Sequence, residues 1–429
     1  MSNGHEPQAG IGFSRPLRIL VVYPVPNPDT CNLCAGLRAR GHEVEFLTSF
    51  ALSRAQADRI PGKRLLSWLG FKIEKRIYPE LDGVRVTLRP TAAICVALWR
   101  RVPAAWRNRT PDLYEIFDRL AASRIRSGCH DVVVSPIGAS GEVFAAAQKR
   151  GLVRVLNLPI VPLTCLQPEL EAERAISAER ARCFGLALDE RRFQQERAEF
   201  AAADGVLAPS PFVELSVRET FKVSVPIFTV LFGAPVHQAP GTGPVPVRKR
   251  LRVLFAGQLV QRKGIFDLLE AAQSLSFEQV ELVIVGPAPF GLTPFGDAVK
   301  RVDYRGALSR SELSRLMAES DVLCLPTLAE GFPLVVLEAM SVGLPVITTD
   351  VCRGVVVPGE NGLFVNRRAP AEIAAAISLL NSDRALLGRL ADGARRTAER
   401  FSWAEYRAGT ARAIETIAEN AAARARGPR

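Results

Sequence analysis

Residues Leu325–Glu338 read LPTLAEGFPLVVLE and stand between two short apolar runs. The run before them, Asp321–Leu325 (DVLCL), and the run after them, Pro345–Thr348 (PVIT), have the length and composition of buried strands. Pro333 suits the start of a helix, because its fixed φ fits the first turn and its missing N–H is not needed there. Residues 334–342 then continue as a mostly buried helix. The stretch therefore predicts strand, loop, helix and strand, which is one repeat of a parallel α/β sheet.

The junction between this loop and this helix combines backbone N–H groups with two carboxylates. A helix start leaves N–H groups unpaired and carries partial positive charge, so Leu334 and Val335 are the expected donors to a phosphate. Gly331 lets the backbone approach a ligand closely. Glu330 precedes the helix, and Glu338 lies inside it among apolar neighbours, where a carboxylate needs donors such as the hydroxyls of a sugar. The alternative is a solvated helix glutamate and a loop glutamate without a ligand.

The run Glu330–Glu338 (EGFPLVVLE), set between these two strands, resembles the Glu-(seven residues)-Glu signature of family 4 glycosyltransferases. That family has the GT-B fold, an α/β architecture of two Rossmann-like domains whose parallel sheets face each other across a cleft. The resemblance implies that Glu330 meets hydroxyls of the donor sugar and that Glu338 meets the ribose of the nucleotide.

A second element, Gly257–Gly264 (GQLVQRKG), follows the predicted strand Leu251–Ala256 and precedes a helix. It lies at the carboxyl end of a strand, where α/β sheets bind ligands. Cleaving a sugar–diphosphate bond leaves negative charge on the departing group, which Lys263 and Arg262 could stabilise. The element resembles the Gly-Arg-(four residues)-Lys-Gly run of the family, although Gln258 replaces the usual Arg. The alternative is a basic turn at the surface.

The resemblance implies a retaining, metal-independent and cofactor-free glycosyltransferase. It would move a sugar from a nucleotide-diphosphate donor to a hydroxyl of a lipid-linked or polysaccharide acceptor. The family's mechanism is drawn as front-face attack in which the leaving phosphate takes the acceptor's proton, so no protein nucleophile is required. The residues expected in catalysis are Glu330, Lys263 and Arg262. Those expected to bind the donor are Glu338, Gly257, Gln258, Gly331, Phe332, Pro333, Leu334, Val335, Gly286 and Arg305.

The chain of 429 residues is long enough for two domains. Residues 236–247 (VHQAPGTGPVPV) are rich in Pro and Gly and mark a linker. We expect a flexible leader (1–16), an N-terminal Rossmann-like acceptor domain (17–235), the linker (236–250) and a C-terminal Rossmann-like nucleotide-sugar domain (251–400). The last part (401–429) is expected to be a helix that crosses back to the N-terminal domain and ends in a frayed tail.

Further elements follow from periodicity and caps. A first strand (17–22), a helix (33–40) and a second strand (42–47) open the chain, and residues 168–200 read as helical. Ser309 is expected to cap a helix together with Glu312.

Two features depart from the family. The first loop, Pro24–Cys34 (PVPNPDTCNLC), replaces the usual glycine-rich loop, and Ser135–Ile137 stand where many relatives carry a cleft His. The pair Cys31 and Cys34 lacks a second CxxC, so it is interpreted as incidental thiols instead of a zinc or redox site. These departures support an alternative function, a catalytically silent GT-B protein that binds nucleotide or a partner enzyme in polysaccharide assembly.

The net charge is +11, and residues 59–109 hold twelve Lys or Arg against three acids. The same segment carries Trp68, Trp99 and Trp106, a composition that suits contact with an anionic membrane. The alternative is a solvated basic face with core aromatics.

No nucleic-acid-binding module is present. No apolar run reaches the ~20 residues of a membrane span, and eight scattered Cys favour a reducing compartment. We expect a cytoplasmic protein, at the inner face of the membrane if the segment binds lipid.

Other enzyme classes fit less well. A dinucleotide-dependent oxidoreductase is disfavoured, because no GxGxxG follows the first strand, and no P-loop pattern occurs. A sugar-nucleotide epimerase of the same architecture lacks the Glu-Glu pattern.

Overall fold

The computed structural model describes residues 15–49, 51–58, 76–88, 113–186, 189–233 and 249–426. Almost all of the predicted leader and linker lie outside these ranges. So does most of the basic segment 59–109, including its three Trp residues. The membrane contact predicted for that segment therefore stays a prediction.

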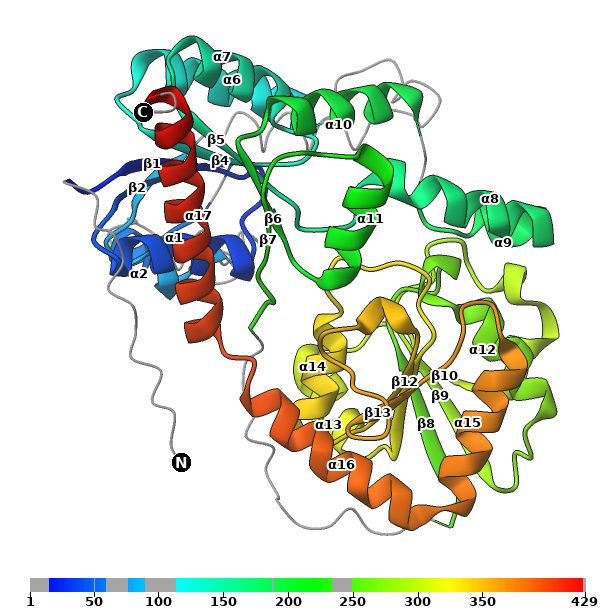
Figure 1. Cartoon of the computed structure of the whole chain (residues 1–429). Coiled ribbons are helices and arrows are strands. Elements are labelled where there is room, and N and C mark those ends of the chain that lie inside the picture. The colour runs from blue at the N-terminus through cyan, green and yellow to red at the C-terminus, as the bar shows by residue number, and fades with distance from the viewer. Residues whose placement is uncertain are drawn as a thin grey trace, which may run out of the picture. The chain divides into compact units, whose positions relative to one another are not determined.

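Within the described ranges, one sheet has seven strands in the order β3-β2-β1-β4-β5-β6-β7 (Figure 1). Ile19 pairs in parallel register with Val44 on one side and Val132 on the other. After its first residue β1 is apolar and buried, as expected for a strand covered on both faces. The strands are β1 (Arg18–Val22), β2 (Glu43–Thr48), β3 (Arg85–Leu88), β4 (Val132–Pro136), β5 (Val153–Asn157), β6 (Gly205–Ala208) and β7 (Ile227–Thr229).

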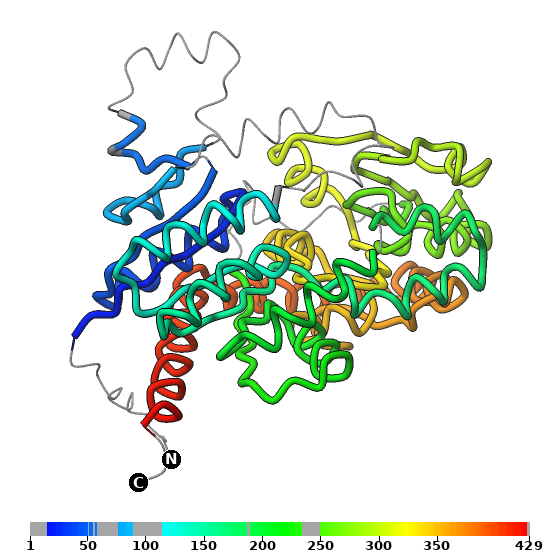
Figure 2. Tube along the Cα trace, turned by 90° about the horizontal axis from the view of Figure 1, so that it is seen from above, coloured from blue at the N-terminus to red at the C-terminus, as the bar shows by residue number. Residues whose placement is uncertain are grey.

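Along this part of the chain, helices alternate with the strands of the seven-stranded sheet. Of these, α6 and α7 lie side by side, as Figure 1 and the view from above in Figure 2 show. Asp118 joins them, because its carboxylate accepts the N–H groups of Glu142 at 2.8 Å and Val143 at 2.9 Å in the first turn of α7. The helices are α1 (Pro28–Ala39), α2 (Arg54–Asp58), α6 (Leu113–Ser127), α7 (Gly141–Lys149), α8 (Gln167–Ile176), α9 (Ala178–Arg182), α10 (Glu190–Ala202) and α11 (Pro211–Phe221).

A second sheet has six strands in the order β10-β9-β8-β11-β12-β13, again within the described residues. Leu323 of β11 pairs in parallel with Leu254 of β8 and with Val346 of β12. The strands are β8 (Leu251–Ala256), β9 (Val280–Val285), β10 (Asp303–Tyr304), β11 (Val322–Leu325), β12 (Val346–Thr348) and β13 (Gly362–Phe364). The strand–loop–helix–strand unit predicted from residues 321–348 is confirmed as β11, a loop, α14 and β12.

The helices that accompany this sheet include the predicted capped one. The Ser309 hydroxyl accepts the Glu312 N–H, and the Glu312 carboxylate accepts the Ser309 N–H at 2.8 Å, so the capping box is confirmed. The helices are α12 (Ile265–Ala271), α13 (Arg310–Ala318), α14 (Leu334–Ser341), α15 (Pro370–Ser382), α16 (Arg384–Glu399) and α17 (Trp403–Arg426).

The first loop is shorter than predicted, because α1 begins at Pro28 and not near Leu33. The Asn27 side chain accepts the Thr30 N–H at 3.0 Å, and Pro28 occupies the first helical position. An Asn cap followed by Pro is a helix-start signal. Cys31 and Cys34 therefore lie inside a helix.

Residues 168–200, which were predicted to be helical, form three helices with breaks between them. Ser177 is extended at φ −162° and caps α9, and Gly185 has φ +92°, so the segment forms α8, α9 and α10. The fraying predicted for the tail is wrong as far as Arg426, where α17 ends. Helix α16 was not predicted; Asp383 caps it by accepting the Leu386 N–H at 2.8 Å.

Contacts between Cα atoms divide the chain into two compact units. One consists of Met1–Leu156, Ala202–Asp204 and Thr410–Arg429, and the other of Asn157–Ala201 and Gly205–Gly409. In the first unit Glu415, in the middle of α17, binds two residues that precede β2: its carboxylate accepts from Arg40 at 2.9 Å and lies 2.9 Å from His42 Nε2. The domain limits predicted at 235–236 and 400–401 remain predictions.

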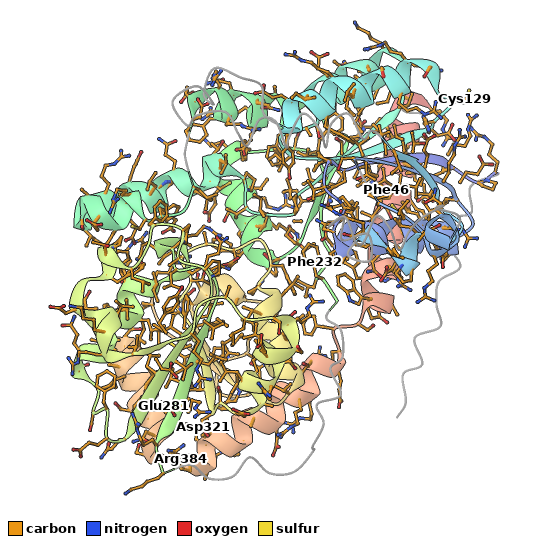
Figure 3. The ribbon with its side chains drawn as sticks, turned by 180° about the vertical axis from the view of Figure 1, so that it is seen from behind. Phe46, Cys129, Phe232, Glu281, Asp321 and Arg384 are labelled. Atoms are coloured by element: carbon orange, nitrogen blue, oxygen red, sulfur yellow. The ribbon has the colours of Figure 1, made fainter. Side chains whose placement is uncertain are left out.

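A cluster of paired charges lies at the amino end of the six-stranded sheet. Asp321 accepts the Arg252 N–H at 2.7 Å, and the Arg252 guanidinium donates to Glu281 at 2.9 Å. Figure 3 shows Glu281 and Asp321 together at this end of the strands. These charges pair with one another, whereas the opposite, carboxyl edge is where α/β sheets bind ligands.

Candidate active site

Two loops meet at the carboxyl edge of the six-stranded sheet, where the strand order changes direction. β8 and β11 are neighbours; β9 and β10 continue from β8 to one side, and β12 and β13 from β11 to the other. Residues 257–264 follow β8, and residues 326–333 follow β11. Such a switch point is the usual ligand site of an open α/β sheet.

Backbone contacts join the two loops. The Leu328 N–H donates to the Arg262 carbonyl at 2.8 Å, and the Thr327 hydroxyl lies 3.0 Å from the same oxygen. Gly264 has φ +75°, and a Cβ there would lie 2.0 Å from the Pro326 carbonyl oxygen. Glycine is required at this position both for the left-handed backbone and for the close approach.

The three residues predicted to act in catalysis come together at one oxygen. The Lys263 ammonium contacts Oε1 of Glu330, and Arg262 Nη1 lies 3.4 Å from it. Thr327 Oγ1 lies 3.2 Å from the same oxygen. Burial raises the pKa of Glu330, but the charges of Lys263 and Arg262 and the hydrogen bonds from Lys263 and Thr327 together bring this pKa below its ordinary value. The carboxylate is therefore ionised at neutral pH.

Arg262 keeps one N–H without a partner. Its Nη1 donates to the Ala329 carbonyl at 2.9 Å, while its Nε is buried and has no hydrogen-bond partner among the described residues. A buried guanidinium N–H without an acceptor is costly, and an anionic oxygen is the acceptor that suits it best.

The start of α14 offers one of the two expected backbone donors. The Leu334 N–H donates to the Phe332 carbonyl at 3.0 Å. The Val335 N–H donates to no backbone carbonyl in the part of the chain that the structure describes. Pro333 caps the helix instead of occupying its first position. The Val335 N–H is thus the free donor at this helix start.

Glu338 lies on the half-buried face of α14 that also carries Leu334 and Val342. Its side chain is 17% exposed, and Arg310, itself 70% exposed, approaches it at 3.6 Å. A surface pair at that distance holds the carboxylate weakly. Glu338 can therefore accept hydrogen bonds from a ligand.

Gly257 and Gly286 meet at the ends of β8 and β9. The Gly257 N–H donates to the Val285 carbonyl at 2.9 Å, and a Cβ on Gly286 would lie 1.7 Å from the Gly257 carbonyl oxygen. Gly286 has φ +140°, and its carbonyl accepts the Tyr304 hydroxyl at 2.9 Å. The two glycines themselves add no side chain at these strand ends.

Gln258 and Arg305, the remaining predicted donor residues, lie beyond these strand ends. The Gln258 side chain is exposed. The Arg305 guanidinium pairs with Asp303 at 2.8 Å. No hydrogen bond joins either side chain to Glu330 or Glu338 within the described residues.

Sequence reasoning did not find Thr327 or Ser210. The Ser210 hydroxyl donates to the Gly331 carbonyl at 2.7 Å. Its position before Pro211 indicates a helix cap, but no local pattern indicates a bond across 121 residues.

The two thiols of the first helix are not poised to react. Cys31 and Cys34 are buried, and burial raises the pKa of each well above its ordinary value.

The described residues contain no group of three or more His, Cys, Asp or Glu that could hold a metal ion. The prediction that the reaction needs no metal is left as a prediction. No helix in the described ranges is long and apolar enough to cross a membrane.

The described residues form two parallel α/β sheets, of seven and six strands, as in proteins of the GT-B fold. The Anabaena protein HepE, solved in complex with UDP, has a TM-score of 0.56 to this chain at 18% identity, covering 95% of this chain and 98% of HepE. This likeness concerns the fold.

The six-stranded sheet and its loops are similar to a known family. Residues 250–383 match the family described as Glycosyl transferases group 1, and we call this part of the chain the group 1 domain. A D-inositol 3-phosphate glycosyltransferase of Streptomyces bingchenggensis is 31% identical over 200 residues, which are 40% of this chain and 43% of that protein. An MMP alpha-(1->4)-mannosyltransferase of Mycolicibacterium hassiacum is 34% identical over 192 residues, 41% of this chain and 45% of that protein. The chain thus spans less than half the length of these curated relatives.

Proposed function

We propose that this protein transfers a sugar, with retention at the anomeric carbon, from a nucleotide-diphosphate-sugar donor to a hydroxyl of a lipid-linked or polysaccharide acceptor. The observation that carries the proposal is the convergence of Lys263, Arg262 and Glu330 at the switch point of the six-stranded sheet. A nucleotide-diphosphate sugar needs fixed cations for its diphosphate and an acceptor for its hydroxyls. All three residues lie in the group 1 domain.

The chemistry follows from the charges. As the bond between the anomeric carbon and the diphosphate breaks, negative charge collects on the leaving oxygens. Lys263 and the unpaired Nε–H of Arg262 stabilise that charge, and the Val335 N–H adds a donor at a helix start. The acceptor hydroxyl bonds to the anomeric carbon on the face that the phosphate leaves, and its proton passes to a phosphate oxygen. No metal, cofactor or protein nucleophile takes part.

Glu338 would hold the ribose, and the strand ends at Gly257 and Gly286 would admit the nucleotide. HepE, which has a similar fold, has been solved with UDP and with UDP-glucose. The relatives are named for inositol 3-phosphate and for mannosyl transfer. The HepE complexes support a sugar nucleotide as donor, and the base and the sugar are to be measured. We place the reaction at the inner face of the membrane, with residues 59–109 as the contact.

Thermal unfolding with a panel of UDP-, GDP-, ADP-, CDP- and TDP-linked hexoses tests the donor site. A ligand that binds only the folded state raises the melting temperature by mass action. We expect one panel member to stabilise the wild type and not Glu338→Ala. Glu399→Ala, which removes an exposed glutamate at the end of α16, is the control and should keep the shift. No shift with any panel member would contradict the proposal.

The silent GT-B protein remains the second candidate, favoured by the exposed Gln258 at the position where the family usually carries an Arg. Both candidates allow nucleotide binding. Release of nucleoside diphosphate in the presence of a membrane or polysaccharide extract distinguishes them, since the silent protein releases none.

A further inference from the structure

The loop that carries Glu330 is held by residues outside the group 1 domain. The Ser210 hydroxyl donates to the Gly331 carbonyl at 2.7 Å. A Cβ on Gly331 would lie 2.6 Å from the Pro159 carbonyl oxygen and 2.7 Å from Ile160 Cα. The backbone of the loop therefore rests directly on the backbone that follows β5.

An aromatic contact holds the next residue. The Phe332 and Phe232 rings have centroids 5.2 Å apart. Phe232, labelled in Figure 3, also meets Tyr406 edge to face at 5.4 Å, and Tyr406 meets Trp403 at 5.6 Å. We call Pro159–Ile160, Ser210 and Phe232 the loop bracket.

Ser210 is the polar member of the loop bracket, and its side chain is held by burial and by two hydrogen bonds. It is 2% exposed. Its one hydroxyl proton goes to Gly331, and its oxygen accepts the Val213 N–H at 3.3 Å as the cap of α11. The Ser210 hydroxyl therefore joins helix α11 to the loop by two hydrogen bonds.

The hydrogen bond from Ser210 matters for the position of Glu330 because its acceptor is a glycine. Glycine allows the close approach to Pro159 and Ile160, but it also gives the backbone beside Glu330 the widest conformational freedom. The bond from Ser210 removes that freedom. We propose that Ser210 is a positioning residue that fixes the Glu330 carboxylate where it meets the donor sugar. This inference rests on the proposed function.

Three substitutions separate this role from helix capping. Ser210→Thr retains both the donor and the cap. Ser210→Gly retains most of the capping preference but cannot donate, and Ser210→Ala loses both. The matched control is Ser216→Ala on the same helix, because the Ser216 hydroxyl donates to Phe212 of its own helix at 2.8 Å.

The first readout needs no substrate. Amide hydrogen exchange of residues 327–336 should rise in Ser210→Gly and Ser210→Ala and stay at the wild-type level in Ser210→Thr and Ser216→Ala. Unchanged exchange in Ser210→Gly overturns the positioning role, whether or not the protein is a glycosyltransferase.

The second readout is kinetic and uses UDP-glucose with UDP, or the corresponding panel pair that stabilises the wild type. We expect kcat for nucleoside diphosphate release to fall about 10- to 100-fold in Ser210→Gly, as for other misplaced groups. Binding of the nucleoside diphosphate alone should not change, and Ser210→Thr should restore the rate. Raised exchange with an unchanged kcat and donor KM also overturns the inference. A wild type that neither binds nor turns over any panel sugar refutes the proposed function instead.

Discussion

The ammonium of Lys263 contacts the carboxylate of Glu330 at a place where the two side chains are only 15% and 9% exposed. The contact joins the loop after β8 to the loop after β11. Pairing stabilises the fold, whereas contact with a donor would affect the rate, so substitutions can separate the two roles.

Lys263→Ala should reduce both stability and turnover. The Lys263 charge is the strongest influence that lowers the pKa of Glu330, so its loss leaves a buried carboxylate that only Arg262 and Thr327 compensate. Breaking a buried pair costs about 3–5 kcal/mol, and removing a group that stabilises transition-state charge costs about 10²–10³ in rate. Urea unfolding and nucleoside diphosphate release measure the two effects.

The double variant Lys263→Ala/Glu330→Gln should regain most of the stability and none of the activity, because the neutral amide needs no counter-charge. Lys300→Ala removes an exposed lysine paired with Asp297 and should change neither quantity. Full turnover in Lys263→Ala would disprove its catalytic role.

Gly264→Ala should destabilise the protein more than Gly291→Ala. Both glycines have nearly the same positive φ, +75° and +73°, and a left-handed backbone costs an alanine about 1–2 kcal/mol. An added Cβ at Gly291 meets nothing within 4 Å, whereas at Gly264 it would lie 2.0 Å from the Pro326 carbonyl oxygen. Urea unfolding of both variants isolates the cost of the close approach. Equal losses would show that Gly264 is needed only for its φ.

Glu173→Gln should cost about 1.5–3 kcal/mol of unfolding free energy, because it removes a buried charge that accepts from two cations, although Arg180 keeps Asp267 and Arg368 keeps Glu169 as partners. Glu173 is fully buried; its two carboxylate oxygens accept from Arg180 and Arg368, each at 2.7 Å. The control is Glu179→Gln, which breaks an exposed pair with Arg182 and should be nearly neutral. Similar unfolding midpoints for the two variants would contradict the importance of the buried pair.

The sequence allowed accurate prediction where a run of apolar residues is long enough to bury a strand. The bounds of β8, Leu251–Ala256, are those predicted from its apolar run. Helix ends were less accurate where a backbone feature interrupts a polar sequence, as at Ser177 and Gly185 between α8 and α10. The start of α1 could have been found, since Asn27 and Pro28 are an ordinary cap signal.

The candidate site was predictable as two separate elements. Each lies after a strand, so the carboxyl edge was expected for both Lys263 and Glu330. Their contact follows from the pairing of β8 with β11, which the order of the strands along the chain does not specify. The bond between Ser210 and Gly331 joins residues far apart in sequence and carries no local signal.

Asp29 in α1 should make stability depend on pH. Its side chain is 7% exposed, and Oδ2 has no hydrogen-bond partner within the described residues. Burial raises the pKa of Asp29 from 3.8 to about 6, against weaker opposition from hydrogen bonds with its own N–H, Thr30 and Asn27. The same carboxyl ionises near its ordinary pKa in the unfolded chain. Between these two values the folded state therefore binds more protons, and the free energy of unfolding falls as the pH rises.

Asp29→Asn should accordingly stabilise the protein at pH 8 and have little effect at pH 4. The difference between the two pKa values corresponds to at most about 3 kcal/mol, present in full above the folded pKa and absent below the unfolded one. Part of this gain is lost if the amide nitrogen finds no acceptor. Asp297→Asn, at a carboxylate that is 90% exposed, is the control and should show no such pH dependence. Urea unfolding at both pH values decides the point, because an equal effect of Asp29→Asn at pH 4 and pH 8 would mean that the buried carboxyl does not titrate between them.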